Sequence, residues 1–239
     1  MKLETCLSGA PLFAGMARGD LTHLLDCLML DCVWYKKTDA IVTAGTAQTS
    51  IGLIARGTAQ ADLALWNGAK KFVRVLTAGD CFGLETAFSA PSAPCEPMKW
   101  ASSVVATRDC QVVFLDAESI FTSCEKKCPF HERFRENLIR VTSRAMYAQS
   151  QRISLLTTKS MRGRITGYLL QQLAEEGADL ATLSLPFNRN QLAAHLDVSR
   201  PSMSRELAHM KAEGLLDYYL DTIQILDIKA LTEKAKEEN

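Results

Sequence analysis

The sequence has little histidine and no long apolar run, and each absence removes a class of protein. Four of its 239 residues are histidine, and in the first 128 residues only His23 occurs. A metalloenzyme site built from several histidines is therefore not expected. No stretch approaches the ~20 apolar residues that cross a bilayer, and the N-terminus lacks the apolar core of a signal peptide. We expect a cytoplasmic protein with no membrane segment and no metal.

A net charge and the common catalytic motifs are also missing. The 27 Lys and Arg residues balance 27 Asp and Glu residues, so a nucleic-acid-binding surface must come from local clustering of charge. The sequence has no nucleophile elbow, no phosphate-binding loop and no zinc-protease motif. We therefore expect that the protein is not an enzyme, and its sequence names no cofactor.

Cysteine is absent from the second half of the chain. All eight cysteines lie between Cys6 and Cys128, and free thiols are expected in a cytoplasmic chain of this size. Cys124 and Cys128 would share one face of a helix, and Lys126 and Lys127 beside them could lower a thiol pKa. A cysteine-based redox sensor therefore stays open as an alternative function.

The first 128 residues are predicted to be β-rich, because short apolar or alternating runs are separated by turn signals. The runs occupy residues 41–43, 51–54, 61–65, 72–76, 103–106 and 110–115. Such spacing favours a closed barrel or a sandwich. Asn67-Gly68 predicts a hairpin with a type I′ turn. We expect a helix over 18–30 before the strands, and a loop over 90–97, where three prolines exclude a central strand.

After Pro129 the apolar residues repeat with a helical period. Their steps alternate between four and three residues, which is typical of a coiled-coil seam. Arginines on the other faces favour a seam between two helices over a helix packed on its own domain, which remains the alternative. The predicted dimer seam consists of Phe134, Leu138, Val141, Ala145, Ala148 and Leu155.

The last third of the chain predicts a winged helix-turn-helix. A helix over 161–176, ending near Gly177, and a short strand over 183–187 come first. A short amphipathic helix from Arg189 is followed by Asp197, which accepts the left-handed backbone of a tight turn. The second strand of a small hairpin over 221–227 would supply the wing.

The second helix of this motif has the features of a DNA recognition helix. Ser199 is a suitable N-cap, and Pro201 falls in the first turn, where a missing N–H costs nothing. Met203, Leu207 and Met210 are expected to be buried, which leaves arginine and serine side chains on the opposite face for guanine and phosphate. A capped surface helix is the alternative. The predicted DNA-binding residues are Arg189, Ser199, Arg200, Pro201, Ser202, Ser204 and Arg205.

Taken together, these segments resemble the Crp/Fnr superfamily of bacterial regulators. The resemblance rests on the segments 10–13 (APLF), 78–83 (AGDCFG), 199–207 (SRPSMSREL) and 223–227 (IQILD). It implies an α+β fold with an N-terminal double-stranded β-helix (jelly-roll) barrel, a long dimerisation helix and a C-terminal winged helix-turn-helix. The implied domains are a cyclic-nucleotide-binding-like sensor barrel at 1–128, the dimerisation helix at 129–158 and the DNA-binding domain at 159–239.

The sequence departs from the cyclic-nucleotide-binding members at the residues that hold ribose and phosphate. Leu84 occupies the place of their glutamate, and Trp100-Ala101 lies near the place of their arginine–serine pair. A buried phosphate needs a charged partner, so we expect a small-molecule effector other than cyclic AMP. The predicted effector pocket, between barrel and dimer helix, contains Gly83, Leu84, Glu85, Lys99, Trp100, Tyr147 and Ser150.

The resemblance also implies partners. We expect a homodimer that binds a two-fold symmetric site on double-stranded DNA and, if it is an activator, RNA polymerase. Pro201 replaces a glutamate that reads cytosine in well-studied members, so the half-site should differ from theirs. An iron–sulfur sensor is disfavoured because Cys6, Cys27 and Cys32 are dispersed, and no histidine is an evident haem ligand. A signalling adaptor without DNA binding is the alternative from another class.

Overall fold

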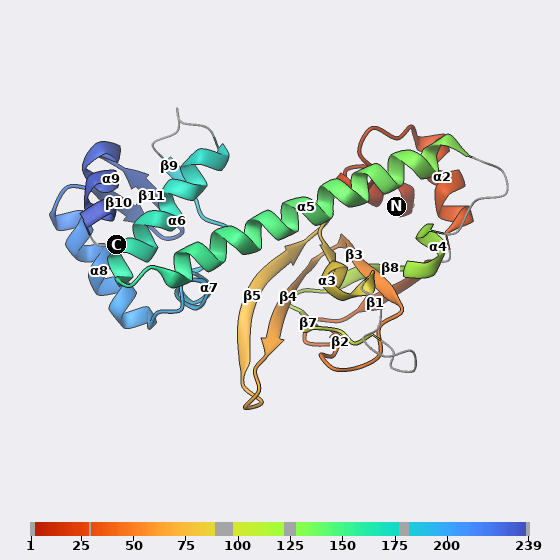
Figure 1. The fold of residues 1–239 in the computed structure, drawn as a ribbon, viewed down its shortest axis with the longest axis horizontal. Coiled ribbons are helices and arrows are strands. Elements are labelled where there is room, and N and C mark those ends of the chain that lie inside the picture. The colour runs from red at the N-terminus through yellow and green to blue at the C-terminus, as the bar shows by residue number, and fades with distance from the viewer. Residues whose placement is uncertain (1–2, 29, 89–97, 122–127, 177–181, 238–239) are drawn as a thin grey trace. The chain divides into compact units, whose positions relative to one another are not determined.

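The computed structural model describes residues 3–28, 30–88, 98–121, 128–176 and 182–237 (Figure 1). The chain divides into two compact units, Met1–Met146 and Tyr147–Asn239. The boundary falls inside the long helix α5, Pro129–Thr157, which contributes to both units. The three-part division at residues 128 and 158 stays a prediction.

The first unit begins with short helices and continues as antiparallel strands. The predicted helix over 18–30 ends earlier, at Cys27, and Leu30 already belongs to a strand. The predicted loop over 90–97 lies outside the described residues. The elements before α5 are α1 Leu3–Leu7, η1 Pro11–Phe13, α2 Arg18–Cys27, β1 Leu30–Tyr35, β2 Ala40–Val42, β3 Ser50–Arg56, β4 Thr58–Ala64, β5 Lys70–Thr77, β6 Cys81–Phe82, α3 Leu84–Ala87, β7 Ser102–Ala106, β8 Cys110–Asp116 and α4 Ala117–Phe121.

The strands form two four-stranded sheets, with the orders β1-β8-β3-β6 and β2-β7-β4-β5. The β-rich domain, the long helix and the C-terminal helix-turn-helix are confirmed. The predicted closed barrel is not observed. Among the described strands, no hydrogen-bonded ladder joins the two sheets, so they form the sandwich that was the alternative from the strand spacing. The N-terminal helices and the first half of α5 gather on one side of the sheets (Figure 1).

Strand β3 is central to this unit because both of its faces are buried. Ile51 and Leu53 pack into a core formed with the N-terminal helices and α5, whereas Ile54 packs between the two sheets. Gly52 lies on the inter-sheet face, where a Cβ would be 2.0 Å from Cζ of Phe82. The ring of Phe82 thus occupies the space that any larger residue at position 52 would need.

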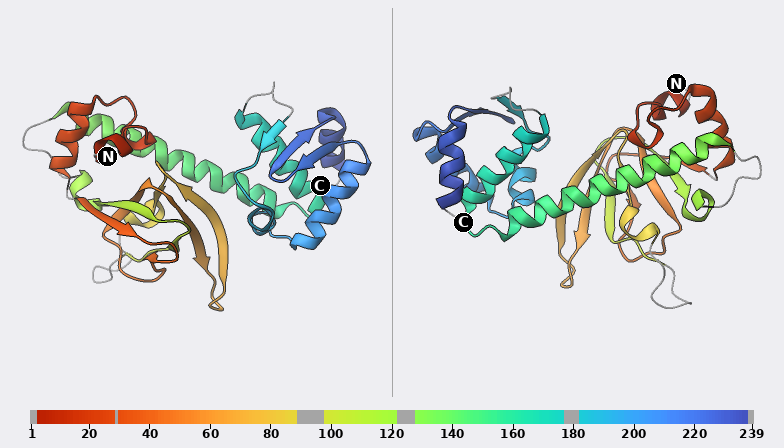
Figure 2. Two further views of the ribbon diagram at one scale, coloured as in Figure 1. Left: turned by 180° about the vertical axis from the view of Figure 1, so that it is seen from behind. Right: turned by 45° about the horizontal axis from the view of Figure 1, so that its top comes forward.

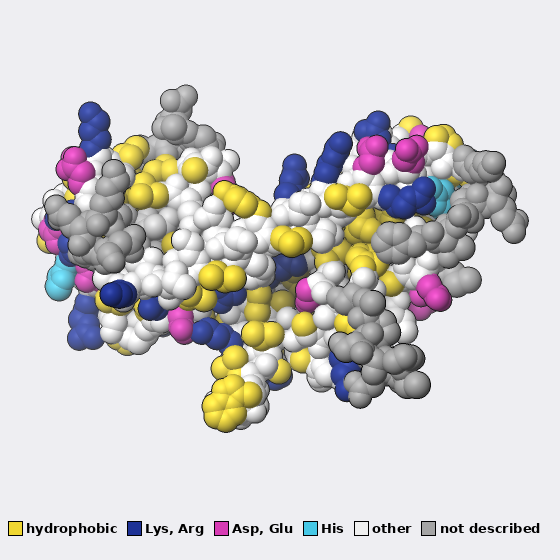
Figure 3. All heavy atoms as spheres, in the orientation of Figure 1, with side chains coloured by type: hydrophobic (Ala, Val, Ile, Leu, Met, Phe, Trp, Pro, Cys, Tyr) yellow, Lys and Arg dark blue, Asp and Glu magenta, His cyan; other side chains and the backbone are white. Residues whose placement is uncertain are grey.

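The hairpin between β4 and β5 forms where Asn67-Gly68 predicts it, but its turn is not type I′. Only Gly68 of the pair has a positive φ, 80°, and a type I′ turn needs two such residues. Leu65 instead accepts from the N–H of Gly68 at 2.9 Å and donates to Ala69 at 2.8 Å, which closes a three-residue loop. Hydrophobic side chains gather at its tip (Figure 3), where Trp66 is 98% exposed.

The second unit has one core, between its helices and a three-stranded sheet of order β10-β11-β9. The helix predicted over 161–176 is found with these bounds, the strand predicted over 183–187 covers 182–184, and Gly177 lies outside the described residues. Helices α6 and α9 pack side by side (Figure 2). The elements are α6 Met161–Glu176, β9 Thr182–Ser184, α7 Arg189–His195, α8 Arg200–Ala212, β10 Leu216–Tyr219, β11 Thr222–Ile225 and α9 Ile228–Glu237.

The contact between Gly52 and Phe82 yields a test of the sandwich core. Gly52→Ala should destabilise the protein by about 1–3 kcal/mol, because the added methyl overpacks the inter-sheet core. The urea midpoint of the full chain measures the effect. Gly9→Ala is the matched control, since a Cβ there meets nothing within 4 Å. Equal midpoints for the two variants would contradict this account of the core.

Candidate nucleic-acid interface and effector site

The first helix of the helix-turn-helix, α7, begins with a capping box. The Asn188 side chain accepts from the backbone N–H groups of Asn190 and Gln191, each at 3.0 Å, and the Gln191 side chain accepts from the N–H of Asn188 at 3.0 Å. This reciprocal pair satisfies donors that a helix start leaves open. This capping box was not predicted, although the Asn-x-x-Gln spacing of residues 188 and 191 is its sequence signal.

The turn after α7 has the backbone that Asp197 was predicted to supply. Asp197 has a φ of 56°. Arg164, on α6, donates through Nη1 to the carbonyls of Leu196 at 3.3 Å and Asp197 at 3.2 Å. The guanidinium therefore satisfies acceptors at the end of α7 and holds the turn against α6. The role of Arg164 was not evident from the sequence, because the residue is more than 30 positions away.

Helix α8 buries one face and exposes the other as predicted. Met203, Leu207 and Met210 are 0%, 1% and 0% exposed. Ser199 caps the helix by accepting from the N–H of Ser202 at 3.2 Å. The exposed residues of its first turns include Arg200, Pro201, Ser204 and Arg205.

Arg205 is held by the residues that cap its own helix. Its Nη2 donates to Oγ of Ser202 at 3.3 Å, and Oγ of Ser202 lies 2.7 Å from Oγ of Ser199. The chain of contacts restricts the guanidinium to the N-terminal end of α8 and leaves its other donors facing solvent. This is the end of a recognition helix that reads base edges in the major groove.

An arginine of α6 clamps α8 at two points. Arg162 pairs with Glu206 through Nε and donates to both carboxylate oxygens of Glu213, at 3.0 and 2.7 Å. Lys234 of α9 pairs with the same Glu213. The hydrogen bonds from Arg162, then those from Lys234, lower the pKa of Glu213 to about 2. The recognition helix is thus fixed to its domain by charge as well as by its apolar face.

Arg189 lies against the wing rather than free on the surface. Its guanidinium is 4.8 Å from the ring centre of Tyr218 on β10, and the Nζ of Lys211 lies 5.4 Å from the same ring. Lys211 also pairs with Asp217. Burial lowers the pKa of Arg189, and its Nη1 has no hydrogen-bond partner among the described residues. Two cations therefore lie close to one aromatic ring where the wing meets the helix-turn-helix.

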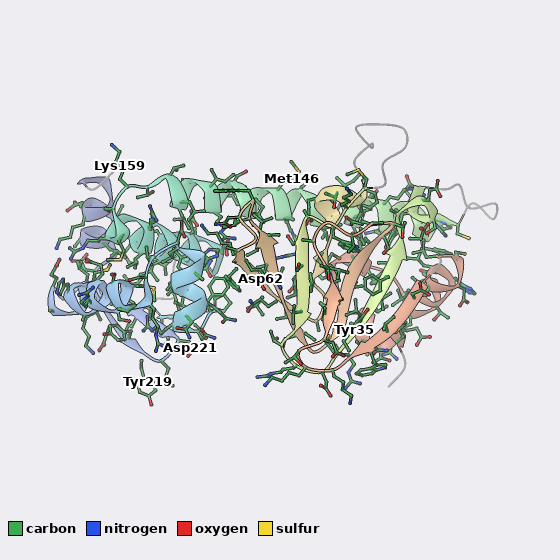
Figure 4. The ribbon with its side chains drawn as sticks, turned by 90° about the horizontal axis from the view of Figure 1, so that it is seen from below. Tyr35, Asp62, Met146, Lys159, Tyr219 and Asp221 are labelled. Atoms are coloured by element: carbon green, nitrogen blue, oxygen red, sulfur yellow. The ribbon has the colours of Figure 1, made fainter. Side chains whose placement is uncertain are left out.

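The tip of the wing is apolar and exposed. Tyr219 and Leu220 are 78% and 70% exposed. Figure 4 shows Tyr219 extending away from the domain near Asp221, at the end of the β10–β11 hairpin. Leu220 has a φ of 52°, so this turn uses the left-handed backbone without a glycine.

In the first unit, the loop that would hold a ribose and phosphate is occupied by the chain itself. Gly83 has a φ of 78°, and a Cβ on it would lie 2.2 Å from the ring of Trp100, which is 7% exposed. The buried Gln48 donates to the carbonyls of Gly83 at 2.7 Å and Ser50 at 3.0 Å, and its Oε1 accepts from Thr86. A tryptophan ring and an amide therefore brace this loop, and the sequence reasoning missed Gln48.

The other predicted pocket residues differ in exposure and divide between the two units. Leu84 is buried in the core beneath the helices, whereas Glu85 and Lys99 are exposed. Tyr147, 62% exposed, and Ser150 belong to the second unit, and the hydroxyl of Tyr147 accepts from Gln151 at 2.5 Å. The pocket as a whole stays a prediction.

Several residues of the predicted dimer seam pack in the cores of their own chain instead of being available to a partner helix. Phe134 and Leu138 are 1% and 4% exposed and pack in the core of the first unit, and Val141 is half-buried beside them. Leu155, 4% exposed, packs in the core of the second unit. Of the six seam residues, Ala145 is half-buried and Ala148 is exposed. The residues at both ends of the seam therefore face their own units, as in the alternative of a helix packed on its own domain.

Two of the described cysteines, Cys81 and Cys110, are buried. Burial raises the pKa of Cys81 to about 12 and also raises that of Cys110. Cys124 and Cys95 lie outside the described residues. Within the described ranges, no three His, Cys, Asp or Glu residues are placed to hold a metal ion, and no helix is long and apolar enough to span a membrane.

Two family models match the chain. A cyclic nucleotide-binding domain matches residues 32–127, and a Crp-like helix-turn-helix domain matches residues 163–234. No curated protein matches the sequence.

Several solved structures share the fold. A mutant of CooA from Carboxydothermus hydrogenoformans has 19% identity and a TM-score of 0.69, over 89% of this chain and 90% of that one. CprK complexed with OCPA has 15% identity and a TM-score of 0.64, over 88% and 92%. FixK2 from Bradyrhizobium japonicum has 18% identity and a TM-score of 0.59, over 86% and 97%. These identities show likeness of fold alone.

The clamp on α8 predicts a pH dependence of stability. The pKa of Glu213 is lowered in the folded protein, so its contribution is complete above the ordinary pKa of 4.5 and is lost as the pH falls from 4.5 towards 2. Melting temperatures of the full chain across this range should fall less steeply in Glu213→Gln than in wild type. Glu136→Gln is the control, since this exposed carboxylate only reaches Arg140 at 4.0 Å. Parallel curves for wild type and Glu213→Gln would refute the clamp.

Proposed function

The chain belongs to the Crp/Fnr family of transcription regulators, and we propose that it acts as a homodimer that binds a two-fold symmetric DNA site under the control of a small-molecule effector other than cyclic AMP. The recognition helix α8 carries the proposal. Arg205, oriented through Ser202 and Ser199, presents free donors at the N-terminal end of an otherwise well-anchored helix. A guanidinium so placed can bind guanine through two parallel hydrogen bonds.

The remaining contacts with DNA follow from the same geometry. Arg200 and Ser204 are exposed on α8 beside Arg205 and are suited to phosphate or base edges. Arg189, held by Tyr218 at the start of α7, adds a further positive charge to the helix-turn-helix. The side chain of Pro201 has no hydrogen-bond acceptor. The base that a carboxylate contacts in other family members must therefore be contacted by another residue or by none.

The dimer is proposed to form along an exposed row of α5. Ile139, Met146 and Ile153 are spaced by seven residues and are 67%, 66% and 62% exposed. Ser143 and Ser150, both exposed, alternate with them in steps of four and three residues. Figure 4 shows Met146 on the side of α5 that faces away from the sheets. Apolar side chains alternating with small hydroxyls suit the close approach of a second helix.

Rejection of cyclic AMP rests on the residues around Gly83. Trp100 and Gln48 occupy the space against this loop, and no arginine follows it in the described chain near Trp100. A phosphate placed against this loop would lose its water without gaining a charged partner from the loop itself. The effector is instead expected to bias two arrangements of the dimer, only one of which presents both recognition helices to DNA. RNA polymerase is a further partner if the protein activates transcription.

Arg205→Ala should weaken binding to the DNA sites that wild type selects from a random pool and should remove the preference at one base pair of each half-site. Loss of a bidentate contact costs about 1–3 kcal/mol of discrimination at one base pair in each half-site. Fluorescence anisotropy with the selected site and with single-base variants measures this loss. Selection of the glutamate-dependent half-site of the family by wild type would contradict the role assigned to Pro201.

Lys36→Ala is the matched control for this experiment. Its side chain is 85% exposed in the first unit and pairs only loosely with Asp109, at 3.6 Å. The variant should bind DNA as wild type does. If wild type selects no DNA with or without cell extract, the adaptor without DNA binding becomes the better description.

Met146→Glu should convert the dimer into monomers, because it places two like charges at the centre of the exposed row. Light scattering coupled to size exclusion measures the mass, and a cooperative thermal transition should show that the monomer is still folded. Arg140→Glu is the control, since its exposed side chain lies on α5 but outside the row. A dimer that survives Met146→Glu and dissociates with Ala148→Glu would instead favour the seam predicted from the sequence.

A further inference from the structure

Arg74 is a cation on strand β5 that points between the two sheets. Strand β5 pairs with β4 so that Leu76 lies opposite Ala59 and Arg74 lies opposite Ala61. Ala59, Ala61 and Leu76 all belong to the inter-sheet core. Residues two apart on a strand share a face, so the side chain of Arg74 enters the sandwich on the same side as Leu76.

The charge of Arg74 is not balanced by a carboxylate among the described residues. Its Nη2 donates to the backbone carbonyl of Cys81, on β6. Asp80 is next in the chain, but its Oδ2 accepts from the N–H and the hydroxyl of Thr77, at 2.7 and 2.9 Å. The Cys81 thiol stays protonated because burial raises its pKa to about 12. A half-buried guanidinium is thus left with a neutral carbonyl as its partner.

The core between the two sheets, which the face of β5 carrying Arg74 borders, is apolar and aromatic. The residue opposite it, Ala61, contributes only a methyl group. The same core contains Phe82, which follows Cys81, and the ring of Trp100 lies 5.7 Å from that of Phe82. Phe114 meets Phe82 edge to face at 6.2 Å. A cation on a strand that borders such a core suits an apolar molecule with a single acidic group.

Arg74 keeps free donors that a ligand can reach. The residue is only partly buried, and the atoms of its guanidinium are not among the sealed polar atoms without partners. A guanidinium presents donors in a planar fork that fits carboxylate and phosphate oxygens in pairs. The carbonyl of Cys81 uses one nitrogen of this fork, which leaves the others for an anion.

We propose that Arg74 is the anion-binding residue of the effector site, and that the effector is a small molecule with an apolar or aromatic body and one carboxylate or phosphate. The inference rests on the proposed function, which supplies the need for an effector. The proposal places the cation that binds the effector on a strand of the sheet and not on the loop after Gly83. The cation expected from the sequence was Lys99, which is exposed.

The test uses the full-length protein with three probes: benzoate, inorganic phosphate and cyclic AMP. Binding is measured by calorimetry and by the shift in melting temperature. Benzoate should bind wild type and should bind Arg74→Gln about 10- to 100-fold more weakly, the loss expected for a charged hydrogen-bonded pair. The cooperative thermal transition recorded in the same experiment shows that the variant remains folded. Binding of phosphate but not benzoate, with the same dependence on Arg74, would assign the anion to a phosphate ester.

Two further variants separate the role of Arg74 from general effects of charge. Arg74→Lys keeps the charge but loses the fork, so its affinity should lie between those of wild type and Arg74→Gln. Arg56→Gln removes an exposed arginine that stacks on Trp34 at 5.9 Å and should bind benzoate as wild type does. Equal affinity of wild type and Arg74→Gln for every probe, or no binding of any probe to wild type, would overturn the proposal.

Failure of this proposal can be distinguished from failure of the proposed function. Anion binding is measured without DNA, and selection of DNA sites is measured without added anion. If wild type selects DNA and Arg74→Gln does so equally, with unchanged anion affinity, the function stands and the assignment of Arg74 falls. If the anion binds through Arg74 and no DNA is selected, the anion site is supported and the proposed function as a DNA-binding regulator is not.

Discussion

The structure depends on how the surface of α5 is divided between a face buried in the two cores and an exposed face. A single helix must bury Phe134 and Leu138 in the first unit and Leu155 in the second, and each such side chain contributes about 1.5–3 kcal/mol when it leaves water. That face cannot also meet another molecule without unfolding one of the cores. The exposed face, with Met146 at its centre, is therefore the part of the helix that remains for a second copy. A dimer formed there would join two copies through a helix that contributes to both cores of its own chain.

The helix-turn-helix was predictable because its determinants are local. Asp197 in the turn, Ser199 at the cap and the buried row of Met203 and Leu207 each act within one or two turns of helix, so sequence spacing carries the information. The residues that orient the motif are distant in sequence. Arg162 reaches acidic residues of α8 more than 40 positions away, and no spacing rule connects them. The helix-turn-helix could therefore be identified from neighbouring residues, whereas the ion pairs of Arg162 that fix it to α6 are visible only in the folded structure.

The errors have physical causes of the same kind. A 4-3 repeat of apolar residues identifies a helical face that needs covering but does not say by what, so Phe134 was assigned to a partner helix when its own domain covers it. Strand spacing cannot distinguish a closed barrel from two sheets, because closure depends on pairing between distant strands. At the β4–β5 hairpin, the right dipeptide was found, but one positive φ at Gly68 sufficed where two were expected.

The first unit retains the fold of a cyclic nucleotide-binding domain while changing the chemistry of its interior. Trp100 and Gln48 brace the loop at Gly83, and each adds bulk where a sugar phosphate would need space. Arg74 adds a positive charge from a strand, where the register with Ala61 directs it inward. A cation that points into a sandwich carries a desolvation cost that a backbone carbonyl offsets only in part. An anion bound to Arg74 would offset the rest of that cost, and recognition of the effector would then lie on the sheet instead of the loop.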